Sequence, residues 1–340
     1  MERYRAWPVS SSTSDSRFSS RPFHKHQHAH RPKKRKQSTV IKPIPPPSSP
    51  PARFGDLPFD LLTKVAAALD APDLRAASMV CRSWRQALQP LREAMVLYVW
   101  GKRFKHGRYA GMDIRPDRVR ALESFLKAAS RGSVAAMVDA GLLYWEMGKR
   151  EKARELYRKA AELGHPIGQC NLGISYLESD PPEQVEAVKW FYHAAMSGNA
   201  RAQYNLALCL HKGRGVECNM HEAAKWYKQA AEGGNVRAMY NTSLCYFSGE
   251  GFPQNTLYAK RWMKLAADCG HKKAQYEHGL KIFLSGDWVR ALVYLELATR
   301  AGNTAASHIK NVIFESLPQN SRDQVMSVVN TWKPSQYRCR

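Results

Sequence analysis

The side chains best suited to acid–base or nucleophilic chemistry in this chain are its histidines and cysteines, and their spacing assembles no recognisable site. His193, His211, His221 and His278 are scattered, each without a partner at catalytic spacing. The chain also has no phosphate-binding glycine loop, no His-Glu-x-x-His zinc motif and no nucleophile elbow. The alternative to this interpretation is a catalytic Cys–His pair whose two members are brought together only by folding. The pattern therefore predicts a protein without enzymatic activity and without a cofactor.

Cysteine usage points in the same direction. The chain has seven cysteines and no Cys-x-x-Cys pair, which favours a reducing compartment and argues against a structural zinc site. Four alternating histidines near the N-terminus could bind a metal weakly, but a flexible tail supplies no surrounding groups to hold the rings. We interpret them as composition and predict no metal site; they are His24, His26, His28 and His30.

The first 52 residues are rich in Ser, His and Pro and poor in aliphatic side chains, which is typical of a disordered tail. They hold eleven Lys and Arg against Glu2 and Asp15, a net charge of +9 out of +23 for the whole chain. Residues 43–51 are mostly proline and serine and predict an extended linker. A basic run in the tail is typical of a nuclear localisation signal, the alternative being a solvated charge run. Its residues are Lys33, Lys34, Arg35 and Lys36.

Polar side chains also recur at one position of a long periodic pattern. Six glycines follow one another at intervals of 32, 34, 36, 36 and 32 residues, and they are Gly132, Gly164, Gly198, Gly234, Gly270 and Gly302. Seven residues after the first five of them stands a polar side chain, the series Asp139, Asn171, Asn205, Asn241 and Glu277. Such a series could bind the backbone or a carboxylate of a target protein. The alternative is a structural role, in which each side chain bonds to a neighbouring turn.

The elements that must carry this series are pairs of helices. Alanine stands eleven and four residues before every repeat glycine, and a large apolar residue stands seven before it. These offsets place a small stripe and a bulky stripe on one helix face, so that neighbouring helices can approach closely. The glycine suits a helix end with positive φ, and in four of the six units the residue after it is a good cap for the next helix. His165 is a poorer cap, but Pro166 after it suits a first helical turn. A buried core role is predicted for Cys209 and Cys245, which share one repeat position.

A period of this length predicts a stacked array of helix pairs, an all-α solenoid. We expect five full units over residues 134–303, a half-unit near 118–132, and a helical cap extending to residue 333. The consensus, clearest over Ala202–Asn235, resembles the Sel-one-like repeat, a relative of the tetratricopeptide repeat. The resemblance implies an α/α superhelix that binds proteins.

Residues 54–100 break the period. Leu61, Leu62, Val65 and Leu69 share one helical face, and about three short helices are expected in fewer than 50 residues. So small a module hides too little apolar surface to be stable alone, which indicates a partner.

The segment Leu57-Pro58 to Val80-Cys81-Arg82-Ser83-Trp84-Arg85 resembles the F-box. The departure from the family pattern is Ala77, where a larger aliphatic residue is common. The resemblance implies docking onto the Skp-type adaptor of cullin–RING ubiquitin ligases. It assigns an interface or supporting-core role to Leu57, Pro58, Leu61, Leu62, Val65, Leu74, Val80, Cys81 and Trp84.

The expected organisation is therefore a three-helix F-box followed by a repeat solenoid. The boundaries are a tail at 1–52, the F-box at 53–105, a linker at 106–117, the solenoid and its cap at 118–333, and a flexible end at 334–340. The leading hypothesis is the substrate receptor of an SCF-type ubiquitin ligase, whose repeats hold the target protein. The second is an interaction scaffold that acts without a cullin.

A third hypothesis, nucleic-acid binding driven by the net charge of +23, ranks last, because the array lacks the aromatic and basic pattern of an RNA-binding module. No signal peptide and no apolar run of membrane-spanning length are recognised, so no membrane association is expected. The expected location is the nucleus, the cytoplasm or both.

Overall fold

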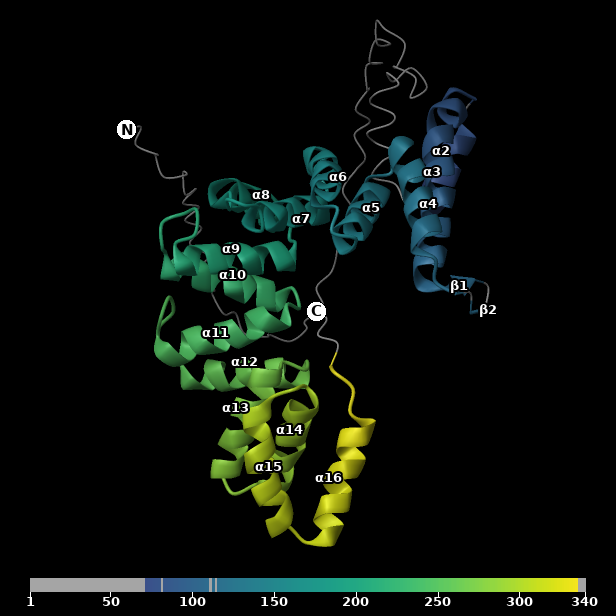
Figure 1. Ribbon diagram of the computed structural model, residues 1–340. Helices are drawn as coiled ribbons and strands as arrows, with labels where there is room; N and C mark the ends of the chain where they lie inside the picture. Colours follow the sequence, from purple (N-terminus) through teal and green to yellow (C-terminus); the bar gives the residue numbers. More distant parts are fainter. Residues whose placement is uncertain (1–70, 81, 110–111, 114, 336–340) are drawn as a thin grey trace, which may run out of the picture. The chain divides into compact units, whose positions relative to one another are not determined.

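The computed structural model describes residues 71–80, 82–109, 112–113 and 115–335 (Figure 1). The chain divides into two compact units, Met1–Ala52 and Arg53–Arg340. The predicted tail, the nuclear signal and the adaptor residues from Leu57 to Val65 lie outside the described residues. All of the described residues belong to the second unit.

Five helix pairs form the centre of this unit, and consecutive helices pack against one another (Figure 1). We call the first helix of each pair the A helix and the second the B helix. The pairs are α5 (Val134–Glu146) with α6 (Arg150–Glu162), α7 (Pro166–Leu177) with α8 (Gln184–Met196), α9 (Ala200–Lys212) with α10 (Met220–Glu232), α11 (Val236–Ser248) with α12 (Thr256–Asp268), and α13 (Lys272–Leu284) with α14 (Trp288–Arg300).

The B helices carry the predicted small and bulky stripes into the core. Every alanine four residues before a repeat glycine is fully buried, and the large apolar residue three residues earlier is buried as well. Small side chains on one helix let the next helix approach, and the bulky side chains fill the space beside them. The bulky positions are Phe125, Tyr157, Phe191, Tyr227, Met263 and Leu295.

The repeat glycines end the B helices as predicted, since all six have positive φ between 79° and 90°. The next residue caps the following helix with its side chain in every unit. His165 and His271, which are weak caps by residue type, do so through Nδ1, which accepts from the backbone N–H of Gly168 and of Ala274 at 3.3 Å. The imidazole thus replaces the shorter Asn side chain of Asn199 at the same position.

A buried glutamine joins three of the units. Five residues after the repeat glycine, the side-chain Nε2 of Gln169, Gln203 and Gln275 donates to a carbonyl near the end of the preceding B helix, at 3.2–3.3 Å. Each of these carbonyls also accepts from the backbone N–H of the repeat glycine, so the glutamine adds a second bond that ties the A helix to the preceding B helix.

Before the central pairs, the structure differs from the sequence-based expectation. The described part contains α2 (Ala71–Val80) and one continuous helix of 25 residues, α3 (Arg82–His106), where several short helices were predicted. Pro90 lies inside α3, and buried Leu88 and Ala94 on either side of it hold the helix in place. The helix continues because its second half packs on α4 (Arg118–Ser130).

The half-unit predicted near 118–132 is therefore complete, with α3 as its A helix and α4 as its B helix. In the predicted linker, two short strands, β1 (Arg108–Tyr109) and β2 (Met112–Asp113), pair antiparallel. The side chain of Asp117 then caps α4.

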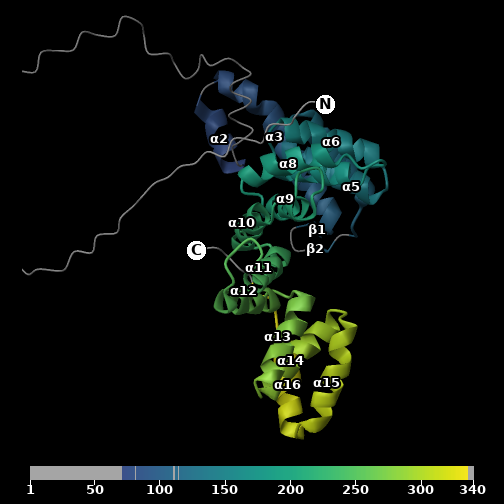
Figure 2. The ribbon, with the colours of Figure 1, turned by 90° about the vertical axis from the view of Figure 1, so that its left-hand side faces the viewer.

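At the other end, α15 (Thr304–Ser316) and α16 (Gln319–Thr331) pack against α14 (Figure 2). Ile313, Val325 and Val329 are buried there, whereas Val312 and Val328 are exposed. Among the described residues, no helix is both long and apolar enough to cross a membrane.

Candidate protein-interaction site

The predicted polar series lies on one face of the A helices, and its side chains bridge neighbouring units. Tyr240 Oη donates to Glu277 Oε1 at 2.6 Å, from α11 to α13. Asn205 Nδ2 approaches Cys170 Sγ at 4.0 Å, from α9 to α7. In both contacts, a residue seven positions after the repeat glycine of one unit meets a residue six positions after the repeat glycine of the preceding unit. The series is therefore part of how successive A helices are held together.

One member of the series is almost fully enclosed. Asn171 is 4% exposed, its Oδ1 accepts from Arg201 Nη1 at 3.5 Å, and its Nδ2 has no hydrogen-bond partner in the described chain. The remaining members, Asp139, Asn205, Asn241 and Glu277, are half-buried. The face thus combines fixed amides with partial access for a ligand.

Cations and leucines flank the polar series on the same helix face. Three residues after the repeat glycine stand Arg201, Arg237 and Lys273, all exposed. Ten residues after it stands a partly or largely exposed aliphatic side chain in every central pair, the row Leu142, Ile174, Leu208, Leu244 and Leu280. Positions three, seven and ten after the repeat glycine are separated by four and three residues and so share a helix face. The A helices therefore present a cationic, a polar and an apolar row side by side.

Charge is distributed unequally between the two sets of helices. The helices α7, α9 and α11 contain no Asp or Glu, and α13 contains only Glu277. Among the ion pairs of the described residues, none involves Arg201, Arg237 or Lys273. From α7 to α11 the A-helix face therefore carries cations and no carboxylate of its own, and Glu277 is the one carboxylate of α13.

The tyrosines on this face are neutral hydrogen-bonding groups. Burial raises the pKa of Tyr204, and burial together with the bonded Glu277 carboxylate raises the pKa of Tyr240. The Tyr240 ring stacks on His271 with 4.6 Å between centroids, and the Tyr204 ring lies 5.9 Å from Tyr227. Both rings are thus already engaged within the protein.

The four scattered histidines have separate partners, and Cys218 Sγ–H donates to the backbone carbonyl oxygen of His211 at 3.3 Å. His193 lies exposed beside the Trp190 ring, and His221 Nδ1 contacts the Gly251 carbonyl oxygen at 2.9 Å. His211 Nδ1 lies 3.4 Å from Tyr227 Oη. His278 packs edge-on against the ring of Tyr294, and burial lowers its pKa to about 4.

The predicted core cysteines are buried as expected. Burial raises the pKa of the Cys209 and Cys245 thiols to about 11, which keeps them protonated and unreactive near neutral pH. No group of three or more His, Cys, Asp or Glu suited to a metal ion occurs among the described residues.

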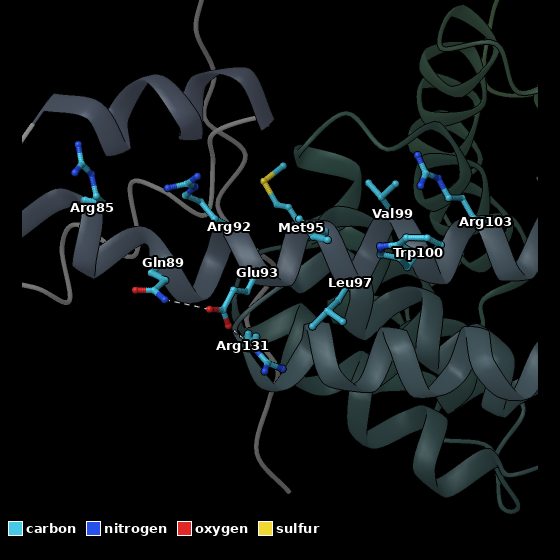
Figure 3. Close-up of a pocket in the computed structure, with 11 residues that line it drawn as sticks. Arg85, Gln89, Arg92, Glu93, Met95, Leu97, Val99, Trp100, Arg103 and Arg131 are labelled. Carbon is cyan, nitrogen blue, oxygen red and sulfur yellow. Dashed lines mark hydrogen bonds and ion pairs between the residues drawn. The ribbon is translucent and has the colours of Figure 1, made fainter. Parts of the chain in front are cut away.

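A second surface lies on α3, where an open groove of about 1130 Å³ runs along the helix (Figure 3). We call it the α3 groove. Its apolar lining includes Val96 and Val99, which are 57% and 45% exposed. Its cationic lining is Arg85, Arg92, Arg103 and Arg131. Such a surface is suited to an apolar partner that carries carboxylates.

Contacts within the α3 groove hold several of these groups in place (Figure 3). Glu93, the one acidic side chain among its described lining residues, accepts from Gln89 at 3.2 Å and from Arg131 at 3.1 Å. The Arg103 guanidinium lies 5.1 Å from the centre of the Trp100 ring. The Trp100 ring in turn stacks on Phe104.

Of the predicted adaptor-binding residues, the structure places two side chains. Val80 is 66% exposed at the end of α2, whereas Trp84 is 7% exposed in a small core with Ala87 and Leu88. Ala77 packs against this core. Because Val80 is exposed it is available to a partner, whereas buried Trp84 supports the fold. Cys81 and the side chain of Leu74 are not among the described parts.

Two features escaped the sequence reasoning. Gly101 faces Phe125 as Gly141 faces Tyr157, and a Cβ at either glycine would clash with the ring. The signal was present, since Gly101 and Phe104 have the same three-residue spacing as Gly141 and Tyr144. The row of cations at Arg201, Arg237 and Lys273 was also periodic, but it spans only three units.

Comparison with known proteins adds the family. The Sel1 repeat model matches residues 97–133, 135–165, 166–199, 200–235 and 236–271, and the F-box-like model matches residues 54–91. The first repeat match begins inside α3, in agreement with α3 as the A helix of a pair. Both families are typically non-catalytic adaptors.

Three relatives illustrate the likeness. The chain is 58% identical to F-box protein At1g70590 of Arabidopsis thaliana over 293 residues, 85% of this chain and 83% of the relative. It is 34% identical to rat DAP3-binding cell death enhancer 1 over 74 residues, 22% of this chain and 14% of that protein. The solved Sel1 repeat protein of Oxalobacter formigenes has a TM-score of 0.56 at 24% identity, covering 80% of this chain and 88% of that one, which supports the fold alone.

An F-box-like segment is joined by one helix to stacked repeats whose exposed faces are suited to protein partners. The chain belongs to the family of Sel1-repeat proteins that carry an F-box-like domain, and it is an F-box protein-interaction scaffold.

Proposed function

We propose that this protein is the substrate-recognition subunit of an SCF-type cullin–RING ubiquitin ligase. In this proposal the F-box-like segment docks on a Skp-type adaptor, and the repeats hold the protein to be modified. The observation that carries it is α3, which includes the end of the F-box-like match at residue 91 and the start of the first repeat at residue 97. One helix therefore links the adaptor end to the target end without a flexible joint.

The adaptor contact is assigned to the apolar residues of the F-box-like segment. Exposed Val80 supports this assignment, because a bulky aliphatic side chain at the end of a short helix gains free energy when a partner covers it. The α3 groove lies on the following helix, whose first residues belong to the F-box-like match, and extends the partner surface at this end of the chain. Leu57, Pro58, Leu61, Leu62 and Val65 complete the proposed contact.

The target contact is assigned to the A-helix face. Its cationic, polar and apolar rows repeat from unit to unit, which suits a ligand that crosses several helices. The series Asp139, Asn171, Asn205, Asn241 and Glu277 lies at the middle of this proposed contact. Because several members also bridge neighbouring units, their substitution would alter both stability and binding.

The adaptor proposal is tested by affinity purification of the full chain from plant cells. The double substitution Leu57→Ala and Pro58→Ala is expected to abolish co-purification of adaptor and cullin. A matched control is Leu284→Ala, which removes an exposed leucine at the end of α13. Undiminished adaptor binding by the double variant would rule out this docking mode, and adaptor without cullin would favour the scaffold alternative.

We further propose that the basic run Lys33-Lys34-Arg35-Lys36 directs the protein to the nucleus. Replacing all four residues with Ala in a fluorescent fusion is expected to shift the protein toward the cytoplasm. As a control, Lys225, Lys260 and Arg261, exposed cations on B helices, are replaced with Ala in the same fusion. An unchanged distribution of the tail variant would show that the basic run is a solvated charge run and not a nuclear localisation signal.

A further inference from the structure

The A-helix face has a chemistry that narrows the class of its ligand. We propose that this face, at α9, α11 and α13, binds an acidic segment in the polyproline II conformation with a carboxylate at every third residue. This inference deepens the proposed function, because it rests on the array being the target-binding part of the receptor.

The first argument is charge. Arg201, Arg237 and Lys273 are exposed at the same position of three consecutive units, and none of them forms an ion pair with a carboxylate of the described chain. The helices α9 and α11 contain no acidic residue that could approach by a side-chain rotation, and on α13 the Glu277 carboxylate accepts from Tyr240 Oη. Complementary charge on a ligand would neutralise this row and would accelerate association.

The second argument is spacing. Side-chain contacts between α7 and α9 and between α11 and α13 show that successive A helices are direct neighbours. Neighbouring helices lie about 8–10 Å apart. A polyproline II helix completes one turn in three residues with a rise of about 3.1 Å per residue, and so repeats about every 9 Å. Every third side chain of such a ligand would therefore meet the same position of the next unit.

The third argument is the apolar row. Leu208, Leu244 and Leu280 lie seven residues beyond the cations on the same helix face. The ligand residues between the carboxylates would cover these leucines, and proline is the residue that covers apolar surface at low conformational cost.

The same observations disfavour two other occupants. A single-stranded nucleic acid would need open aromatic faces for base stacking, but the Tyr240 ring already stacks on His271 and the Tyr204 ring lies against Tyr227. The chain's own proline-rich segment, residues 43–51, has no carboxylate and follows a tail of net charge +9, so the cationic row would repel it.

The test uses the full chain and fluorescence anisotropy. The probe is a labelled peptide of four consecutive Glu-Pro-Pro triplets, and its matched control places all four Glu residues together at one end. Binding of the periodic peptide about tenfold tighter than the block peptide is expected, because the block peptide reaches only one or two units. Equal affinity for the two peptides, or binding of neither, would overturn the proposal.

Two charge-reversal variants locate the contact. The triple substitution Arg201→Glu, Arg237→Glu and Lys273→Glu is expected to weaken binding of the periodic peptide at least about tenfold. The control triple Lys225→Glu, Lys260→Glu and Arg261→Glu has the same net charge on the B helices and is expected to change affinity less than about threefold. Equal losses would show binding to net charge alone and would contradict the assigned face. All six side chains are exposed, and circular dichroism verifies that both variants fold.

Competition and adaptor binding complete the design. If an oligouridylate, or a peptide of residues 37–52, displaced the Glu-Pro-Pro probe at lower concentration than unlabelled probe, that occupant would replace the one proposed. Co-purification of the adaptor is expected to be unchanged in both charge-reversal variants. Intact adaptor capture without peptide binding would reject this inference alone, and peptide binding without adaptor capture would reject the ligase proposal alone.

Discussion

Glycine nine residues after the repeat glycine is required for packing rather than for backbone conformation. At Gly173 a Cβ would lie 2.7 Å from Phe191 Cε1 and 3.1 Å from the Ala187 carbonyl oxygen. The equivalent positions Ala207 and Ser243 hold larger residues, and Ser243 lies opposite Met263, a more adaptable side chain than Phe. Glycine at position 173 therefore lets the Phe191 ring approach the backbone of α7.

Gly173→Ala is expected to destabilise the protein by about 2 kcal/mol, because the close-packed ring and backbone cannot move aside freely. Its control is the reverse change, Ala207→Gly, which is expected to cost about 1 kcal/mol through helix propensity. Urea denaturation measures both. A Gly173→Ala variant as stable as the parent would show that the α7–α8 contact relaxes at no cost.

The histidine caps make stability depend on pH. Burial, followed by nearby Arg237, Lys273 and Lys272, lowers the pKa of His271 from 6.5 to about 4. A depressed histidine pKa means that the unfolded chain binds the proton more readily, so stability is complete above pH 6.5 and falls as the pH drops from 6.5 toward 4. Protonation would also remove the Nδ1 acceptor that caps α13.

His271→Asn is expected to keep the cap. Between pH 6.5 and pH 4 the variant should lose about 1 kcal/mol less stability than the parent protein. The measurement is the melting temperature as a function of pH. Asn235→Ala, which removes the uncharged side-chain cap of α11, serves as control and should lower the melting temperature by a similar amount at every pH. An identical profile for His271→Asn would mean that the cap does not titrate in this range.

At the scale of elements, the turns set how closely successive units stack. Gly251, in the turn between α11 and α12, has φ of 79°, and a Cβ there would overlap the Met220 carbonyl oxygen and lie 2.6 Å from Ala224 Cβ on α10. Gly215 packs in the same way against Gln184 at the start of α8. Both turns thus contact the B helix of the preceding unit through backbone alone.

Gly251→Ala is expected to cost about 3 kcal/mol, since it combines an unfavourable φ with a clash against helix backbone. Gly286→Ala separates the two effects, because Gly286 has φ of 90° and no atom within 4 Å of the added Cβ, and a loss of about 1 kcal/mol is expected there. Thermal unfolding of both variants tests the comparison. Equal losses would show that the close approach to α10 contributes nothing.

How far the sequence predicts these elements depends on whether the determinants are local. The stripes, the repeat glycines and the Asn caps act within one helix or one turn, and the structure has them where the spacing predicts. The long helix α3 was not predicted, because its continuation past Pro90 depends on contacts with α4, such as the packing of Gly101 on Phe125. The bonds from Tyr240 to Glu277 and from Arg201 to Asn171 link different units, and periodicity alone did not show them.

At the scale of the whole described unit, α3 joins the F-box-like end to the repeats, since it contributes to a small core around Trp84 and Leu88 and to a second core with α4. Phe125 of α4 packs on α3, with its ring 5.7 Å from that of Tyr98. In stacked repeats each pair contacts only its neighbours, so a defect spreads from where it is made. Damage to the first pair should therefore reach the F-box-like end, and damage to the last pair should not.

Phe125→Ala is expected to destabilise by about 3 kcal/mol and to increase amide hydrogen exchange in α2 and α3. Leu295→Ala makes the equivalent cavity in α14 and is expected to increase exchange in α13 to α16 only. Mass spectrometry of exchanged peptides distinguishes the two patterns. Uniform exchange changes in both variants would mean that the unit unfolds as a single cooperative block.

A shared helix also restricts how such receptors can be recombined. The two family matches meet between residues 91 and 97, in the interior of α3, so an exchange of modules at that seam would splice two half-helices from different parents. The next place to cut lies between the end of α3 at His106 and the start of α4 at Arg118. In evolution and in designed chimeras alike, we therefore expect the first helix of the array to be exchanged together with the F-box-like segment.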